Sequence, residues 1–415
     1  MTRTMGYKKV YEVSLALMAF LMLVSPKLVT IGIILHFVIT VVGIYKRKLV
    51  FGVNLMNVLM ALLFGAYLVG AIYTNHPDIA GKYLEYKLAL VVFPLLFSFK
   101  LPEGFSLKYS GVGLFSGVIV LMVLGFINSI SLYVDSNSMS SFLSGQFSYI
   151  HHPTYFSSFA FVAMLLVNHA KEQYWFGSKK WTYIVLIFIT VLGQLLSFSL
   201  AGILVLLIYV GFVLLKWVLN RFEKRYFITV LLLSPVVLFL IISNTPGLNT
   251  QFETSKKFVL TYVNDPLGFL CTDQSYVQGD ETRLIMWTVA ALEFADHPMG
   301  AGTGNVDDKL NAQLEYYEQS EVASHNYNPH NQYLQTAVEV GVFGLFFFSA
   351  IIAYALYLGF RFKNVFIAFI GLNLAFNSLF ESMLQRQSGI VFFVFWLCLS
   401  ALMLLSVNSK SYKNS

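Results

Sequence analysis

Apolar runs recur along the whole chain, and shorter polar segments separate them. Most runs hold about 18–20 residues, which is the helical length needed to cross a hydrocarbon core of roughly 30 Å. The pattern predicts an all-α, polytopic membrane protein with about twelve transmembrane helices. These spans are expected near residues 11–25, 28–45, 50–73, 84–99, 111–133, 154–169, 181–198, 200–219, 226–243, 333–357, 363–380 and 389–407.

The positions of the basic residues predict how the spans are oriented. Of the 27 Lys and Arg residues, nineteen fall in one set of alternate loops and eight in the other set. Because cytoplasmic loops carry the excess of Lys and Arg, the first set is expected to be cytoplasmic, together with both termini. The largest hydrophilic loop, residues 244–329, is then expected on the outer side of the membrane.

This loop divides one integrated membrane domain into three stretches of sequence. Residues 1–243 are expected to form spans one to nine, residues 244–329 the partly helical outer loop, and residues 330–415 spans ten to twelve. Within the loop, residues 280–297 show the period of an amphipathic helix. The apolar face expected for that helix comprises Leu284, Trp287, Ala291 and Phe294.

Composition agrees with a membrane protein and excludes several other classes. The chain is 57% hydrophobic and 12% charged, whereas soluble domains average about 25% charged residues. The net charge of +6 is explained by loop residues that anchor the spans, so no nucleic-acid partner is expected. Phosphate-binding loops, dinucleotide-binding turns and zinc-ligand spacings are missing from the sequence, and the adjacent pair Asp307–Asp308 is interpreted as a solvated face. We therefore expect a site that uses no metal and no nucleotide cofactor.

The stretch Ser324–Leu345 is the richest in side chains that could carry chemistry. Pro329 stands where a helix would start, with Asn328 as its N-cap, so His330 is expected in the first turn of the tenth span. Helix-end N–H groups oppose protonation of an imidazole, and a neutral His can act as a general base toward a hydroxyl. The alternative is an interfacial His that only bonds a loop carbonyl, and the residues alone leave both open.

Three further groups are candidates for parts of a site. Arg283 lies near the start of the expected loop helix, where a guanidinium and helix-end amides would clamp a phosphate. The alternative is a surface ion pair with Asp280 or Glu281. Asn373, Asn377 and Glu381 recur at four-residue spacing as a polar stripe leading toward Arg386, and such groups must face the bundle interior. The stripe could equally be a structural network. The third group is the pair His151–His152, which opens the sixth span before Pro153.

Taken together, these motifs resemble the O-antigen ligase and O-antigen polymerase superfamily. The resemblance rests on the run Pro329–Leu334 with Gly341 and Gly344 downstream, and on Arg283-xxx-Trp287 followed by Pro298–Gly304. The number of spans and the large late outer loop are similar too. The run His152–Phe156 and the sequence Glu381-xxxx-Arg386-Gln387 resemble one branch of that superfamily.

The resemblance implies an inverting, metal-independent glycosyltransferase at the periplasmic face of a bacterial inner membrane. The donor would be a glycan on undecaprenyl pyrophosphate, and the acceptor a hydroxyl of lipid A–core for a ligase, or a second lipid-linked glycan for a polymerase. His330 would activate the acceptor hydroxyl, and Arg283 would bind the donor pyrophosphate. The polar residues expected to support them are Asn331, Gln332, Asn377, Glu381 and Trp287.

One position departs from the family pattern. The family usually has a second Arg in a turn that opens the eighth span, and Leu200 stands there in this chain. Arg386, His151 or His152 could supply the missing charge. A lipid-linked oligosaccharide flippase or transporter is the alternative from another class, but the sequence shows no internal repeat of the kind that transporters carry. The sequence does not identify the donor glycan, the acceptor or the oligomeric state.

Overall fold

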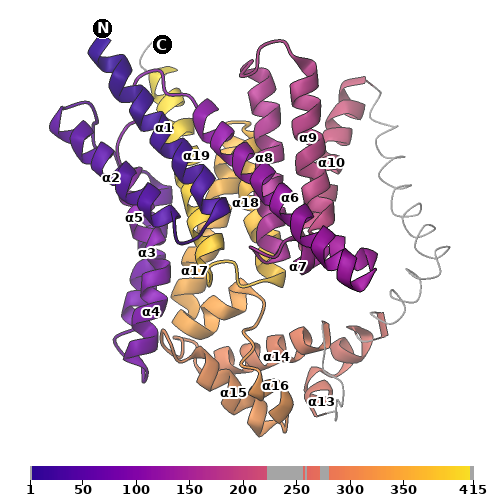
Figure 1. Cartoon of the computed structure of the whole chain (residues 1–415). Coiled ribbons are helices and arrows are strands. Elements are labelled where there is room, and N and C mark those ends of the chain that lie inside the picture. Colours follow the sequence, from indigo (N-terminus) through magenta and orange to yellow (C-terminus); the bar gives the residue numbers. More distant parts are fainter. Residues whose placement is uncertain (1, 222–255, 258, 272–279, 412–415) are drawn as a thin grey trace.

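The computed structural model describes residues 2–221, 256–257, 259–271 and 280–411, and this part of the chain is all helical (Figure 1). An isolated antiparallel bridge between Phe51 and Phe99 is the one β-type pairing among these residues. The helices are α1 (Thr2–Val24), α2 (Val29–Tyr45), α3 (Leu55–Gly70), α4 (Pro77–Lys87), α5 (Ala89–Leu96), α6 (Lys108–Ser136), the 3₁₀ helix η1 (Met139–Phe142), α7 (Ser144–Phe147), α8 (Pro153–Glu172), α9 (Lys180–Leu196), α10 (Leu200–Arg221), α13 (Pro266–Leu270), α14 (Asp280–Asp296), α15 (Val306–Tyr316), α16 (Ser320–Ser324), α17 (Gln332–Arg361), α18 (Val365–Phe380) and α19 (Gln387–Ser411).

Most predicted spans coincide with helices of the structure. Four helices, α6, α10, α17 and α19, are long and apolar enough to cross a membrane by length and composition, and α2, α3, α9 and α18 are shorter apolar helices. The predicted span 84–99 is not one helix, because the chain makes tight three-residue turns at Leu88, which separates α4 from α5. The predicted span 226–243 lies outside the described residues. The chain is thus a membrane protein, and the number of twelve spans stays a prediction.

Two hydrophobic cores organise the molecule. The larger core runs through the bundle formed by the long helices, and the smaller lies among α13, α14, α15 and α16 and includes Val338 of α17. Figure 1 shows α13–α16 as a layer at one end of the bundle, whereas both chain termini lie at the opposite end. The layer therefore packs on the beginning of α17, close to the candidate site residue His330.

A kink in α17 is built around the glycine-rich turn Pro298–Gly304. Gly341 has φ +70°, and a Cβ there would lie 2.3 Å from the carbonyl carbon of Met299, so only glycine fits without a shift of backbone. The kink frees the carbonyls of Val338 and Glu339. They accept N–H groups of the turn at 2.7 and 3.1 Å. The turn thus satisfies the backbone of a broken helix and fixes the direction of its first segment.

Helix α14 confirms the helix predicted over residues 280–297, but the predicted apolar face is only partly right, because Leu284 and Phe294 are half-buried against the smaller core and do not form its centre. The buried face comprises Ile285, Met286, Val289 and Ala290, whereas Ala291 of the predicted face is exposed. Trp287 is half-buried on another side of the helix, with its ring 6.5 Å from that of Phe380. Apolar residues occur on two sides of α14 because the helix lies between the bundle and the outer layer, so periodicity alone did not identify the most buried side.

Candidate functional site

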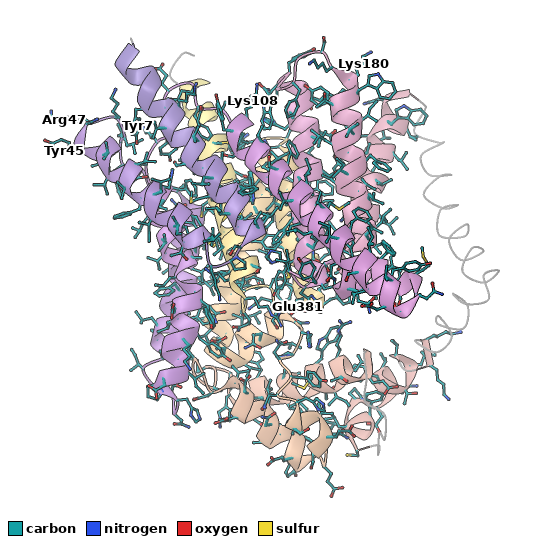
Figure 2. The ribbon with its side chains drawn as sticks, viewed as in Figure 1. Tyr7, Tyr45, Arg47, Lys108, Lys180 and Glu381 are labelled. Atoms are coloured by element: carbon teal, nitrogen blue, oxygen red, sulfur yellow. The ribbon has the colours of Figure 1, made fainter. Side chains whose placement is uncertain are left out.

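Glu381 is the residue on which the candidate site converges. It follows α18 with an extended backbone, and its side chain is buried between the bundle and the α13–α16 layer (Figure 2). One carboxylate oxygen, Oε2, lies 3.3 Å from Nδ1 of His330 and 3.7 Å from Nδ1 of His152. These three residues come from the end of α18, the approach to α17 and the start of α8, which are far apart in sequence.

His330 lies before α17 and not in its first turn, so the predicted helix start is wrong. Helix α17 begins at Gln332 because the side chain of Asn331 accepts two N–H groups of the first turn. Asn328, which the sequence suggested as N-cap, instead accepts the N–H of His330 at 2.8 Å. His330 itself has φ +46°, an uncommon left-handed conformation for a residue other than glycine. This turn of the chain directs the imidazole toward Glu381.

His152 is positioned as the N-cap residue of α8, with Pro153 at the first helical position as the sequence predicted. Its side chain makes no capping bond, so the ring points away from its own helix toward Glu381. At 3.7 Å the contact is an electrostatic one and too long for a hydrogen bond. Nδ1 of His152 is buried and has no hydrogen-bond partner among the described residues. This orphan polar atom faces the site and fits a bound polar group.

The electrostatics of the site combine one carboxylate with several cationic groups. Burial alone raises the pKa of Glu381, but the hydrogen bond from His330 and the positive fields of His152 and Arg386 outweigh it, so the pKa lies below its usual value. Burial lowers the pKa of His152. Glu381 opposes this change, and the positive charges of Arg386, His330 and Arg283 add to it. Arg283, Arg386, His330 and His152 therefore act within the same small volume, which favours the uncharged form of His152 and the charged form of Glu381.

His151 is the predicted site residue that the structure places apart from this group. Its Nδ1 lies 3.0 Å from the hydroxyl of Ser388, and its Nε2 bonds the carbonyl of Leu23. The ring is buried, and it joins the end of α1 to the start of α19. Its two nitrogens are thus engaged within the protein, whereas the neighbouring His152 faces the site.

Two of the supporting residues hold the segment around Glu381 in place. Gln332 accepts the N–H of Leu384 at 2.6 Å and donates to Thr336 at 2.9 Å. Asn377 donates to the carbonyl of Asn373 at 2.8 Å, one turn below Glu381. The Gln332 contact holds the middle of the segment 381–387 against α17, and the N–H of Glu381 donates to the carbonyl of Asn377 at the end of α18.

Trp287 is the other predicted residue near the site, on the layer side. Its indole Nε1 is buried and has no hydrogen-bond partner among the described residues. The ring lies against Phe380, which directly precedes Glu381. An unpartnered donor at this position can serve a polar substrate, since buried indole N–H groups usually find a partner.

A buried charged pair beneath the site was missed at the sequence level. Nζ of Lys87 lies 3.3 Å from Oε1 of Glu339 and 3.0 Å from Oε1 of Gln385, and Gln385 donates to Glu339 at 2.8 Å. Both charged side chains are almost fully buried. The signal was present, because Lys87 and Glu339 are charges inside two predicted spans, and such charges are costly unless they pair.

The position where the family pattern expects a second Arg lies beside the start of α8. Leu200 opens α10 and is exposed, and the preceding Ser199 caps the helix by accepting the N–H of Gly202. The hydroxyl of Ser199 is 3.5 Å from that of Thr154, two residues after His152. His152 thus lies close along the chain to the helix start that lacks the Arg.

Comparison with known proteins agrees with the resemblance. Residues 184–349 match a family model described as O-antigen ligase, and no curated protein matches the chain. The matched stretch contains Arg283, the Pro298–Gly304 turn and His330, while His152 and Glu381 lie outside it. The family supports activity of the O-antigen ligase or polymerase type in general. Over residues 184–349, this membrane protein is similar to the O-antigen ligase family.

Proposed function

We propose that the protein is an O-antigen ligase that transfers a glycan from undecaprenyl pyrophosphate to a hydroxyl of lipid A–core. The transfer would invert the anomeric configuration, use no metal ion and take place at the periplasmic face. The observation that carries the proposal is the pairing of His330 with Glu381 at 3.3 Å, within the electrostatic reach of Arg386 and of His152, on which Arg283 also acts. Acid–base chemistry and anion binding thus have candidate groups in one place.

In the proposed mechanism the carboxylate sets the tautomer of His330. Because Glu381 is ionised, its oxygen accepts a proton-bearing Nδ1, which leaves Nε2 of His330 with a free lone pair. Nε2 takes the proton of the acceptor hydroxyl while the hydroxyl oxygen bonds to the anomeric carbon. The bond from that carbon to the pyrophosphate oxygen breaks on the opposite face. Positioned bases of this kind contribute about 10²–10⁴-fold in rate.

The arginines would stabilise the departing pyrophosphate. Arg283 lies in the first turn of α14, where helix-end N–H groups add to its positive charge. Arg386 is exposed and directly precedes α19. Each guanidinium offers two parallel donors to phosphate oxygens, which an ammonium group cannot reproduce. The neutral His152 completes the set as a hydrogen-bonding group.

A test with purified protein follows from this geometry. Arg283→Lys and Arg386→Lys keep the charge but lose the fork, so we expect both to lose most transfer from a lipid-pyrophosphate donor to lipid A–core. The matched control is Lys309→Ala, which removes a loop charge away from the site and should leave the rate unchanged. Transfer by Arg386→Ala at the wild-type rate would remove Arg386 from the proposed site and make His152 the next group to test.

A deletion strain would separate the proposed ligase from a polymerase. Loss of all long chains from an otherwise complete lipid A–core, with polymerised donor accumulating, is the result expected for a ligase. Single-repeat caps on lipid A–core would instead assign the chain to the polymerases. The glycan profile of the strain, compared with a complemented strain, distinguishes the two outcomes.

A further inference from the structure

A cavity of about 740 Å³ lies at the end of the bundle that is remote from Glu381. It is enclosed by the last turn of α8, the first turn of α9, the middle of α10 and the turn between α17 and α18. Lys180, which lines it, is labelled in Figure 2 at the end that carries both termini, whereas Glu381 lies toward the α13–α16 layer. The cavity therefore plays no part in the candidate site.

The lining of this cavity is strongly cationic. Lys171, Lys180, Lys216 and Lys363 converge on it from four separate elements, and Glu172 is the single acidic residue of the lining. No ion pair joins any of these lysines to another residue in the described parts of the chain. Several exposed ammonium groups around one hollow, with one carboxylate among them, favour an anion as the occupant.

Apolar and aromatic side chains from the bundle form another part of the lining. Leu165 and Tyr209 are buried there, and Phe212 is half-buried. A second cavity of about 190 Å³ shares His169, Asn364 and Phe366 with the first, and its other lining residues are mostly apolar. Together the two cavities offer lysine side chains and apolar side chains. These match the two parts of an anionic phospholipid, because the lysines suit its phosphate and the apolar surface suits its acyl chains.

Neighbouring aromatic residues place the lysines of the cavity at the height of lipid headgroups. Trp181 and Tyr174 are 78% and 73% exposed. Trp181 follows Lys180 in the first turn of α9, and Tyr174 comes shortly after Lys171, just beyond the end of α8. Exposed Trp and Tyr at the end of an apolar helix are typical of the membrane–water interface. Basic pockets between transmembrane helices at this level suit lipid phosphates.

We propose that this cavity binds an anionic glycerophospholipid of the adjacent leaflet. The four lysines would hold its phosphodiester, and an acyl chain would lie along the apolar side chains of α8, α10 and α18. The inference is independent of the glycan transfer proposed above, because it concerns different residues and the opposite end of the bundle. Phosphate is the shared chemistry of a lipid headgroup and of free inorganic phosphate, so the test must separate the two sources.

The test uses the full-length protein in phosphatidylcholine nanodiscs, with increasing fractions of phosphatidylglycerol of the same acyl chains. We expect saturable binding of phosphatidylglycerol, measured by native mass spectrometry and by an upward shift of the melting temperature. Removing two charges with Lys180→Gln and Lys363→Gln should weaken this binding by about tenfold or more, since each basic residue near an anionic headgroup contributes appreciably.

A matched variant and a phosphate arm make the outcome decisive. Arg47→Gln with Lys108→Gln removes the same number of charges at the same end of the bundle, outside the cavity, and should bind phosphatidylglycerol as the wild type does (Figure 2). Equal weakening in both double variants would show a general surface effect and overturn the proposal. It would also be overturned if inorganic phosphate displaced the lipid and gave the same melting shift, since the ligand would then be the free ion.

Discussion

Replacing Lys87 by Met tests the buried charged pair that underlies the candidate site. Lys87 is in contact with Glu339 of α17 and with Gln385, which lies between Glu381 and Arg386 in the segment after α18. Its ammonium also lies 4.4 Å above the ring centre of Tyr67. The substitution keeps the volume of the side chain but removes the cation, so Glu339 is left buried without its partner.

The expected magnitude follows from the burial of both groups. Their side chains are 1% and 0% exposed, and removing one partner of such a pair typically costs about 3–5 kcal/mol. Loss of the cation–π contact adds about 0.5–2 kcal/mol. If Glu339→Gln is combined with Lys87→Met, no uncompensated charge remains, and replacing both members of a buried pair is often close to neutral. The double variant should therefore be much more stable than Lys87→Met alone.

Unfolding in detergent, followed by intrinsic fluorescence, gives the four corners of this double-mutant cycle. Transfer activity measured on the same samples should fall in Lys87→Met, because Gln385 then loses the contact that positions the segment carrying Glu381. Recovery of stability by the double variant is the central expectation. Wild-type stability in Lys87→Met, or equal destabilisation in the single and double variants, would refute the view that a paired buried charge holds this segment.

Three further predictions concern the site and its side of the membrane. His330→Ala should lose about 10²–10⁴-fold in transfer rate, measured with donor and acceptor in detergent, while His325→Ala, an exposed residue stacked on a neighbouring tyrosine, should be nearly normal. In the wild type the low pKa of Glu381 keeps the carboxylate charged as pH falls to about its usual value of 4.5, so its contribution is lost only in more acidic solution. Glu381→Gln should lower the rate, because the carboxylate no longer accepts the Nδ1 proton that orients the imidazole of His330; a wild-type rate in this variant would contradict the pairing. A reporter that works only in the cytoplasm should be active when fused after Lys180 and silent near Lys309, and activity at Lys309 would reverse the expected orientation.

Much of the helical architecture could be predicted because it depends on local apolar runs. The runs that gave α6, α17 and α19 are long, and the membrane requires each backbone group to be paired within its own helix. The His and Arg motifs also identified candidates that the fold brings to one place. What joins them, the shared carboxylate of Glu381, was included only as one of several supporting residues.

The errors have a common physical origin in contacts between distant segments. Asn328 was the natural N-cap by position, yet its side chain is used by His330 and Ser382, and Asn331 caps α17 instead. The prediction for the buried face of α14 was only partly right because the bundle and the α13–α16 layer both contact apolar residues of this helix. Local preferences rank these alternatives closely, and tertiary contacts decide between them.

The glycine-rich turn and the buried pair of Lys87 and Glu339 are connected through one residue, Glu339. The turn Pro298–Gly304 bonds the carbonyl of Glu339, whose side chain pairs with Lys87 and Gln385. Glu339 thus contacts the turn through its backbone carbonyl and the segment after α18 through its carboxylate. The segment after α18 begins with Glu381, and His330 directly precedes the first part of α17. The kinked helix α17 therefore positions both residues of the hydrogen-bonded pair. A His–carboxylate pair tolerates little displacement before the hydrogen bond fails. The kink of α17 is therefore expected to matter for the geometry of the pair as much as for the packing of the bundle.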